Sequence, residues 1–211
     1  MFNKFQSIIC ILTLALSTLC FSQTTAPKVS LQTNIGEIII ELNPAAAPIS
    51  VENFLGYVNE RFYDGIIFHR VIKDFMIQAG GHRFDMTAKP PSKPPIVNES
   101  TNGLKNLKYT IAMARTRFPD SATSQFFINH KDNAFLDGQK GRPGYAVFGK
   151  VVKGKDVVEK IANSKTKNLE RYGNVPVKTV SIIKAVVIKD TSTKSTEKES
   201  LKTEPTNKAK T

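Results

Sequence analysis

The chain has 211 residues, of which 40% are hydrophobic and 23% are charged. This globular composition excludes a collagen, a long coiled coil, a polytopic membrane protein and a wholly disordered chain. The formal net charge of +12 suits contact with anionic partners. Because the basic residues are dispersed and no nucleic-acid motif accompanies them, we expect a basic solvated surface and no nucleic-acid partner.

The chain begins with a segment typical of a secretory signal peptide. Lys4 precedes an apolar run over 7–21, and small residues three and one before Gln23 fit cleavage after Ser22. The run is shorter than the about 20 residues of a membrane-spanning helix. We therefore predict a signal peptide over 1–22 and export, to the periplasm of a Gram-negative bacterium. No stable membrane insertion is expected after cleavage, whereas an uncleaved leader would anchor the protein to the membrane.

Both cysteines, Cys10 and Cys20, lie inside this leader. Lipidation at Cys20 is disfavoured because the preceding Leu19 is bulkier than the small residue such processing prefers. After cleavage the chain has no disulfide, thiol nucleophile or thiolate metal ligand. An exported protein without disulfides depends on core packing, which a domain of about 150 residues can supply.

The pattern between 27 and 189 is mostly of short apolar segments with period two, which is typical of half-buried strands. Eight strands are expected, over 29–33, 37–42, 66–71, 75–79, 108–113, 124–129, 146–152 and 178–189. Two segments show helical spacing, one after a candidate N-cap at Ser50 and one after Asp156. Pro48 and Gly154 mark the helix entries. The sequence therefore predicts a mainly β fold, a closed eight-stranded antiparallel barrel capped by two helices, because closure removes exposed strand edges.

The segment 190–211 differs from the rest of the chain in composition. It is rich in Thr, Ser, Lys and Glu, and Leu201 is its only large apolar residue. Such a segment buries too little apolar surface to offset the loss of chain entropy, so we predict a disordered tail. The predicted organisation is a signal peptide over 1–22, one folded domain over 23–189 and the tail over 190–211.

Three stretches place polar or cationic residues among apolar neighbours: 68–81, 112–129 and 133–150. Arg70 and Gln78 stand out, because a charge in an apolar strand is costly unless it is paired or faces a cleft. The three histidines are a weaker signal. His69 faces away from Arg70 by strand alternation and is expected to be structural, while His82 and His130 stand alone. Three scattered histidines predict no metal site, and no cofactor motif is evident.

At these residues the chain resembles the cyclophilin family of peptidyl-prolyl cis-trans isomerases, most closely its bacterial periplasmic members. The resemblance covers about 28–188 and rests on several motifs in the family's order, among them Phe-His-Arg-Val-Ile at 68–72 and Phe-Met-Ile-Gln at 75–78. It implies an eight-stranded antiparallel barrel with two helices and isomerisation of Xaa-Pro bonds without a cofactor. The implied partners are proline-containing unfolded or extended polypeptides, including exported proteins during folding, and we expect a monomer.

The resemblance also implies roles for individual residues. Arg70 corresponds to the family's catalytic arginine, and Gln78 would hold it in position. The substrate-binding residues carried over by motif position are Phe75, Met76, Ala114, Arg115, Gln125, Phe127, Phe135, Leu136 and Tyr145. Of these, Ala114 and Gln125 would line the subsite for the residue before proline.

Three of these positions differ from the best-known eukaryotic members. Phe135 and Tyr145 stand where those carry Trp and His, and Arg115 stands where they carry Asn. Isomerase activity should tolerate the first two changes, whereas tight cyclosporin binding is not expected because the Trp indole donor is absent. At Arg115 the contacts of this loop with a substrate backbone should differ.

The residue types agree with this chemistry. Rotation about a peptide bond has a barrier of about 18–20 kcal/mol, but no covalent bond breaks, so neither a nucleophile nor a metal is required. The alternative is a noncatalytic chaperone or scaffold that uses the pocket only to bind proline-containing segments. A basic surface that binds anionic lipid is a further alternative.

Overall fold

The computed structural model describes residues 26–189 and places ten strands and two α-helices in them. One sheet contains β1 (Lys28–Thr33), β2 (Gly36–Leu42), β3 (Arg70–Ile72), β4 (Met76–Ala79), β5 (Thr110–Met113), β6 (Phe126–Asn129), β7 (Val147–Lys153) and β10 (Ile182–Ile188). A second sheet contains β8 (Thr166–Leu169) and β9 (Tyr172–Pro176). The helices are α1 (Pro48–Asn59) and α2 (Lys155–Ala162), with a 3-10 turn η1 (Ala134–Leu136). The predicted leader, both cysteines and the predicted tail lie outside the described residues.

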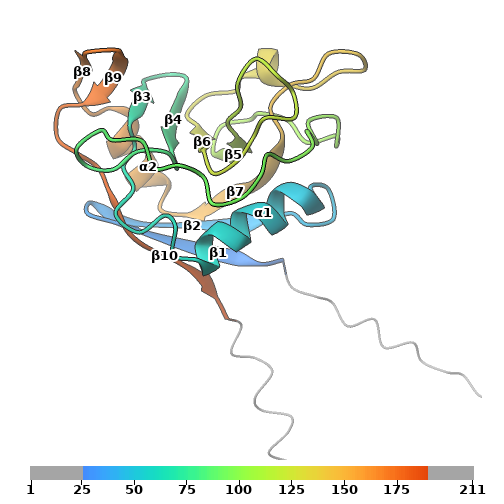
Figure 1. Cartoon of the computed structure of the whole chain (residues 1–211), viewed down its shortest axis with the longest axis horizontal. Coiled ribbons are helices and arrows are strands. Elements are labelled where there is room, and N and C mark those ends of the chain that lie inside the picture. Colours follow the sequence, from blue (N-terminus) through green and yellow to red (C-terminus); the bar gives the residue numbers. More distant parts are fainter. Residues whose placement is uncertain (1–25, 190–211) are drawn as a thin grey trace, which may run out of the picture.

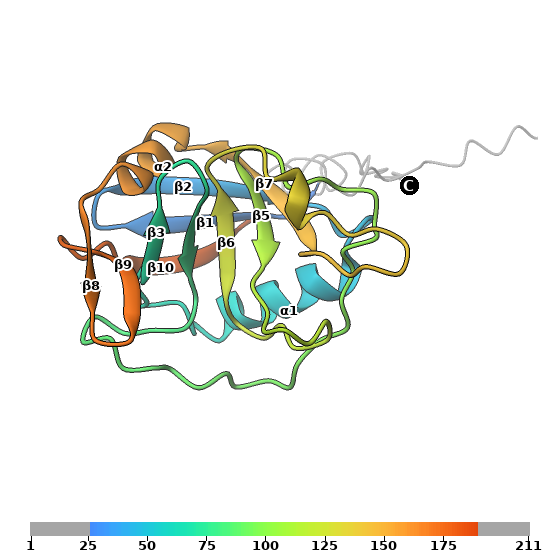
Figure 2. The same cartoon turned by 90° about the horizontal axis from the view of Figure 1, so that it is seen from above.

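The large sheet is antiparallel, has the order β10-β1-β2-β7-β5-β6-β4-β3 and curves around the core. The two helices lie at opposite ends of this curved sheet (Figures 1 and 2). The prediction of a mainly β fold with two helices is confirmed.

The prediction of a closed barrel is wrong, because the sheet is an open half-barrel. Its edge strands β3 and β10 do not form a ladder with each other. Irregular backbone before each of them bridges the gap instead: Ile67 and Ser181 form an isolated bridge, and the Phe68 N–H donates to the Val180 carbonyl oxygen at 2.9 Å. The segments that lead into the two edge strands thus pair with each other, although the strands themselves do not close the sheet.

The hairpin of β8 and β9 was not among the predicted strands. Its residues Thr166 to Asn168 are exposed and polar, so the hairpin lacks the alternation of apolar residues that marks a half-buried strand. The hairpin lies beside the edge strand β3. It therefore shields that edge in the folded molecule.

Helix α1 begins earlier than its side-chain pattern indicates. Pro48 occupies the first turn as expected, but the N-cap residue is Ala47, so the prediction of Ser50 as the N-cap is wrong. The cap comes from a distant carboxylate: Glu99 accepts hydrogen bonds from the backbone N–H groups of Ile49 (3.0 Å) and Ser50 (2.8 Å) and from the Ser50 hydroxyl (2.7 Å). A carboxylate there satisfies free N–H groups and opposes the helix dipole.

Helix α2 begins directly after Gly154. This agrees with the prediction that Gly154 marks the entry to the second helix. Gly154 has φ of +83°, and a Cβ on it would clash with the backbone of Glu37 in β2. Only glycine fits this left-handed conformation and close approach. The glycine therefore fixes where β7 turns into α2.

The two faces of the sheet carry different clusters. On the inner face Phe54 of α1 packs against Tyr63, Phe126 and Phe148, with ring centroids 5.2–5.4 Å apart. Strand alternation turns the neighbouring residues to the opposite face, where Met76, Ala112, Phe127, Leu136 and Val147 form a second apolar cluster. No helix among residues 26–189 has the length and apolar composition needed to cross a bilayer.

Candidate active site

Arg70 and Gln78 lie directly opposite each other on β3 and β4. Their side chains therefore share one face of the sheet. The Arg70 Nη1 donates to Gln78 Oε1 at 3.4 Å, and Gln78 Nε2 donates to Gln125 Oε1 at 2.9 Å. The Gln125 side chain lies so close to Gly81 that a Cβ there would come within 2.6 Å of the amide nitrogen. A chain of two glutamines thus holds the half-buried guanidinium in one place.

A cavity of about 120 Å³ opens beside this guanidinium. Phe127 on β6 and Tyr145 form one wall, with their rings edge to face at 5.6 Å. The lining residues are Arg70, Phe75, Met76, Gln78, Ala114, Arg115, Phe127, Leu136 and Tyr145. A small apolar pocket with a few fixed polar groups at its mouth suits one small apolar ring and orients the polar bond attached to it.

All of the predicted site residues except Gln125 and Phe135 line this cavity. Gln125 does not line the cavity itself but accepts a hydrogen bond from Gln78, which does. Phe135 is 68% exposed and stacks on Phe75 with ring centroids 5.7 Å apart, so it forms the rim. A wider cleft of about 520 Å³ along β2, Leu104 and β7 contains none of the predicted residues.

Comparison with known proteins agrees with this geometry. The family model described as cyclophilin type peptidyl-prolyl cis-trans isomerase/CLD matches residues 28–187. The chain belongs to the cyclophilin family.

Bacterial relatives of this cyclophilin are similar over most of their length. Peptidyl-prolyl cis-trans isomerase A of Dickeya dadantii (strain 3937) is 51% identical over 183 residues, which are 87% of this chain and 96% of the relative. Peptidyl-prolyl cis-trans isomerase B of Escherichia coli (strain K12) is 48% identical over 165 residues, 77% of this chain and 99% of the relative. A crystal structure of a Cryptosporidium parvum cyclophilin type isomerase, in the presence of the dipeptide Ala-Pro, superimposes with a TM-score of 0.64 at 25% identity, covering 77% of this chain and 99% of that one.

Arg115 has a more local set of contacts than its motif position implies. Its guanidinium donates to the carbonyl oxygens of Thr116 (3.0 Å), Pro143 (2.8 Å) and Gly144 (2.8 Å), and it lies 4.6 Å from the centroid of the Tyr145 ring. These bonds and the cation–π contact fix the Tyr145 wall of the cyclophilin pocket. Arg115 therefore shapes the pocket through Tyr145.

Sequence reasoning missed a buried polar network beneath the pocket. The Asn133 side-chain amide donates to the Phe75 carbonyl oxygen (2.9 Å) and to Asn129 Oδ1 (2.7 Å). The Asn129 amide in turn donates to Asn106 Oδ1 (3.2 Å), and the Asn106 backbone N–H donates to Asp137 Oδ1 (2.8 Å). The signal in the sequence was Asn129 at the end of an apolar strand, since a buried amide needs partners. This network ties η1 to the turn between β3 and β4.

The histidines are not isolated, contrary to the prediction for His82 and His130. The rings of His69 and His82 lie 4.3 Å apart, and His130 bonds to Glu159 at 2.9 Å. Burial lowers the pKa of His69 to about 3, with smaller contributions from His82 and Arg70. His69 is 6% exposed and neutral at pH 7, as expected of a structural histidine. Within residues 26–189 no three His, Asp or Glu side chains are placed to share a metal ion.

Proposed function

We propose that this cyclophilin catalyses cis–trans rotation about Xaa-Pro peptide bonds at the cavity beside Arg70. The observation that carries the proposal is a guanidinium fixed by Gln78 at the mouth of a small apolar pocket. The relatives named above as peptidyl-prolyl cis-trans isomerases support the same activity.

The pocket residues suit this reaction because rotation needs stabilisation of a twisted amide and nothing else. In the twisted state the proline nitrogen regains its lone pair and accepts a hydrogen bond better than in the planar amide. A fixed guanidinium donates to the substrate carbonyl throughout and gains a contact at the nitrogen during rotation. Only an interaction that strengthens in this way accelerates the step.

The free energies involved indicate that the apolar wall of the pocket contributes part of the rate acceleration. A charge-assisted hydrogen bond contributes about 1.5–3 kcal/mol, whereas a millionfold acceleration requires about 8 kcal/mol. In the proposal Phe127, Met76 and Leu136 grip the proline ring, while Ala114 and Gln125 lie near the residue before it. The wall also excludes water, and the less polar transition state is favoured in such a dry environment.

For the substrates we propose extended proline-containing polypeptides, including exported proteins during folding. The cavity admits little more than one ring, and its charged lining residues are Arg70 and Arg115, which favours recognition of the Xaa-Pro bond itself. The leader-like segment 1–22 supports export to the periplasm. The lining of the cavity comes from one chain, which supports action as a monomer.

The first prediction tests the role of Arg70. We expect Arg70→Ala to lower kcat/KM at least about ten- to a hundredfold in a protease-coupled assay with a prolyl peptide, since it removes a charge-assisted hydrogen bond. The matched control is Arg61→Ala, which removes a guanidinium 74% exposed and paired with Asp64, outside the cavity. Undiminished activity of a folded Arg70→Ala variant contradicts the assignment. A folded wild-type chain that binds the peptide without accelerating it supports the noncatalytic scaffold instead.

A further inference from the structure

The turn between β3 and β4 carries part of the proline pocket in an unfavourable backbone conformation. Ile72 pairs with Met76 across the turn, and the Phe75 N–H donates to the Ile72 carbonyl oxygen at 3.2 Å. Between them Asp74 has φ of +57°, a left-handed conformation for which Gly or Asn is preferred at this position of a β-turn. For most residues with a Cβ it costs about 1–2 kcal/mol, and Asp is one of the few that adopt it as single residues. Contacts from elsewhere in the fold can therefore stabilise the turn.

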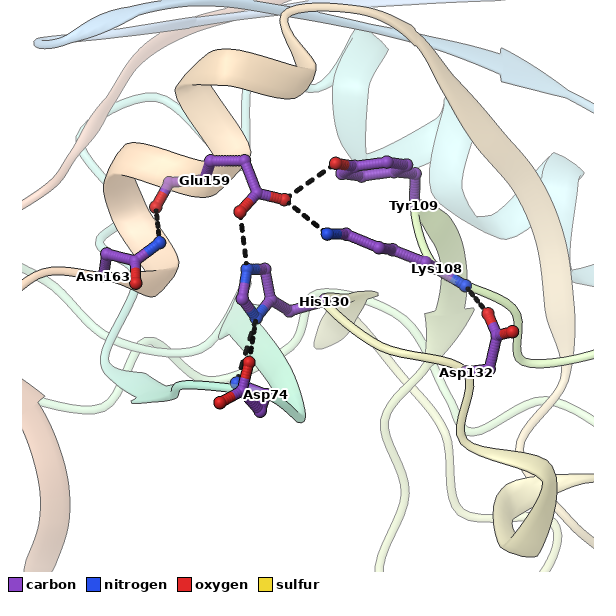
Figure 3. Close-up of polar contacts among 7 residues, drawn as sticks. All are labelled: Asp74, Lys108, Tyr109, His130, Asp132, Glu159 and Asn163. Carbon is purple, nitrogen blue, oxygen red and sulfur yellow. Dashed lines mark hydrogen bonds and ion pairs between the residues drawn. The ribbon is translucent and has the colours of Figure 1, made fainter.

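His130 supplies such contacts from the end of β6. Its Nδ1 accepts a hydrogen bond from the Asp74 N–H at 2.9 Å (Figure 3). Its own backbone N–H donates to the Phe75 carbonyl oxygen at 2.9 Å. The imidazole is only 4% exposed. Phe75 lines the cavity. His130 therefore bonds both to this lining residue and to Asp74, which precedes it.

The other ring nitrogen ties His130 to helix α2. Because Nδ1 accepts, Nε2 carries the proton and donates it to Glu159 Oε2 at 2.9 Å. Glu159 also accepts from the Tyr109 hydroxyl at 2.7 Å and pairs with Lys108 Nζ at 2.9 Å. The bonds from Lys108, His130 and Tyr109 lower the pKa of Glu159 to about 2, so it stays an anion that fixes the ring.

We propose that His130 is a positioning residue for the isomerisation. Its Nδ1 holds Asp74 in the left-handed conformation and thereby keeps Phe75 against the proline pocket, while Glu159 fixes the tautomer and orientation of the ring. The inference rests on the proposed function, because it assigns His130 to the same pocket. It requires the Nδ1 contact in particular, and the Nε2 contact only as its support.

Two near-isosteric variants separate these contacts. In His130→Asn the amide oxygen lies near the position of Nδ1 and can accept from the Asp74 N–H, but the side chain is too short for Glu159. In His130→Gln the amide nitrogen reaches Glu159 and the acceptor for Asp74 is lost. Both variants remove the buried ring, so a purely structural role of His130 would affect them alike.

The expected results differ between the variants. His130→Gln raises KM for a prolyl peptide about three- to tenfold, the size of one lost hydrogen bond, and the Asp74 amide exchanges faster with solvent. His130→Asn keeps KM within about twofold of wild type and keeps the Asp74 amide protected. Adding Asp74→Gly to His130→Gln restores KM toward wild type, because glycine adopts the left-handed conformation at no steric cost.

Two outcomes overturn the proposal: equal KM values for the two variants, or a His130→Gln variant with the KM and Asp74 amide protection of wild type. Failure of the proposed function is distinguishable, because amide exchange at Asp74 is read without any enzymatic activity. If Arg70→Ala abolishes turnover while both His130 variants match wild type, the isomerase site stands and the role of His130 does not.

Discussion

His69 shows how burial alone sets the chemistry of a side chain. Its Nδ1 has no hydrogen-bond partner among the described residues, and its ring packs on that of His82 just before β3. The pKa of His69 falls from 6.5 to about 3 chiefly because the charged form is desolvated, and burial lowers the pKa of His82 as well. The folded state therefore excludes protons that the unfolded chain binds.

This difference predicts a pH dependence of stability. Between about pH 6.5 and 3 the unfolded chain binds a proton at His69 that the folded chain does not, so stability falls as pH falls, by about 1.4 kcal/mol per pH unit. We expect urea denaturation of wild type at pH 7, 6 and 5 to show this loss. His69→Phe keeps the ring volume and removes the titration, so its slope should be smaller. An equal slope in both proteins contradicts the assignment to His69.

Among single residues, the sequence motifs identified Arg70, Gln78 and the apolar wall as candidate site residues, because each residue type suits the reaction and occurs at the family's spacing. They did not identify His130. Its partners Asp74 and Glu159 lie 56 and 29 residues away in the sequence, so no local pattern connects them. Arg115 lines the cavity, but its bonds to Pro143 and Gly144 depend on how two loops meet.

Among the elements, helix α1 depends on a carboxylate from outside itself. We expect Glu99→Ala to lower the free energy of unfolding by about 1–2 kcal/mol, the usual effect of a lost N-terminal cap, since the N–H groups of Ile49 and Ser50 lose their acceptor. Chemical denaturation measures the change, and Glu52→Ala on the exposed side of the same helix serves as the control. A Glu99→Ala variant as stable as the control would show that water caps the helix equally well.

The strands of the large sheet could be predicted because each has an apolar face with period two. β3 shows where this periodicity misplaces a strand boundary. The apolar pattern extends over 66–71, but the ladder begins only at Arg70. The preceding Ile66 and Ile67 form isolated bridges with Arg83 and Ser181 instead. The hairpin of β8 and β9 has no such pattern, since it packs on an edge of the sheet.

For the whole molecule, the cavity draws its lining from residues between Arg70 and Tyr145, within the described residues 26–189. We therefore expect a chain shortened to 26–189 to fold and to keep kcat/KM within about twofold of the full-length chain, because the residues named in the cavity lining all lie within it. The protease-coupled assay and a thermal melt compare the two chains. A folded but inactive short chain would assign a part in catalysis to 1–25 or 190–211.

The sequence by itself determined the mainly β class, the two helices and most of the pocket residues, because periodicity and motif spacing are local properties of the chain. Only the tertiary structure decided that the sheet stays open, that Glu99 caps α1, and that His130 joins α2 to the turn of Asp74. These features are contacts between residues far apart in the sequence. Their existence depends on burial and on which unpaired backbone groups meet once the sheet has curved.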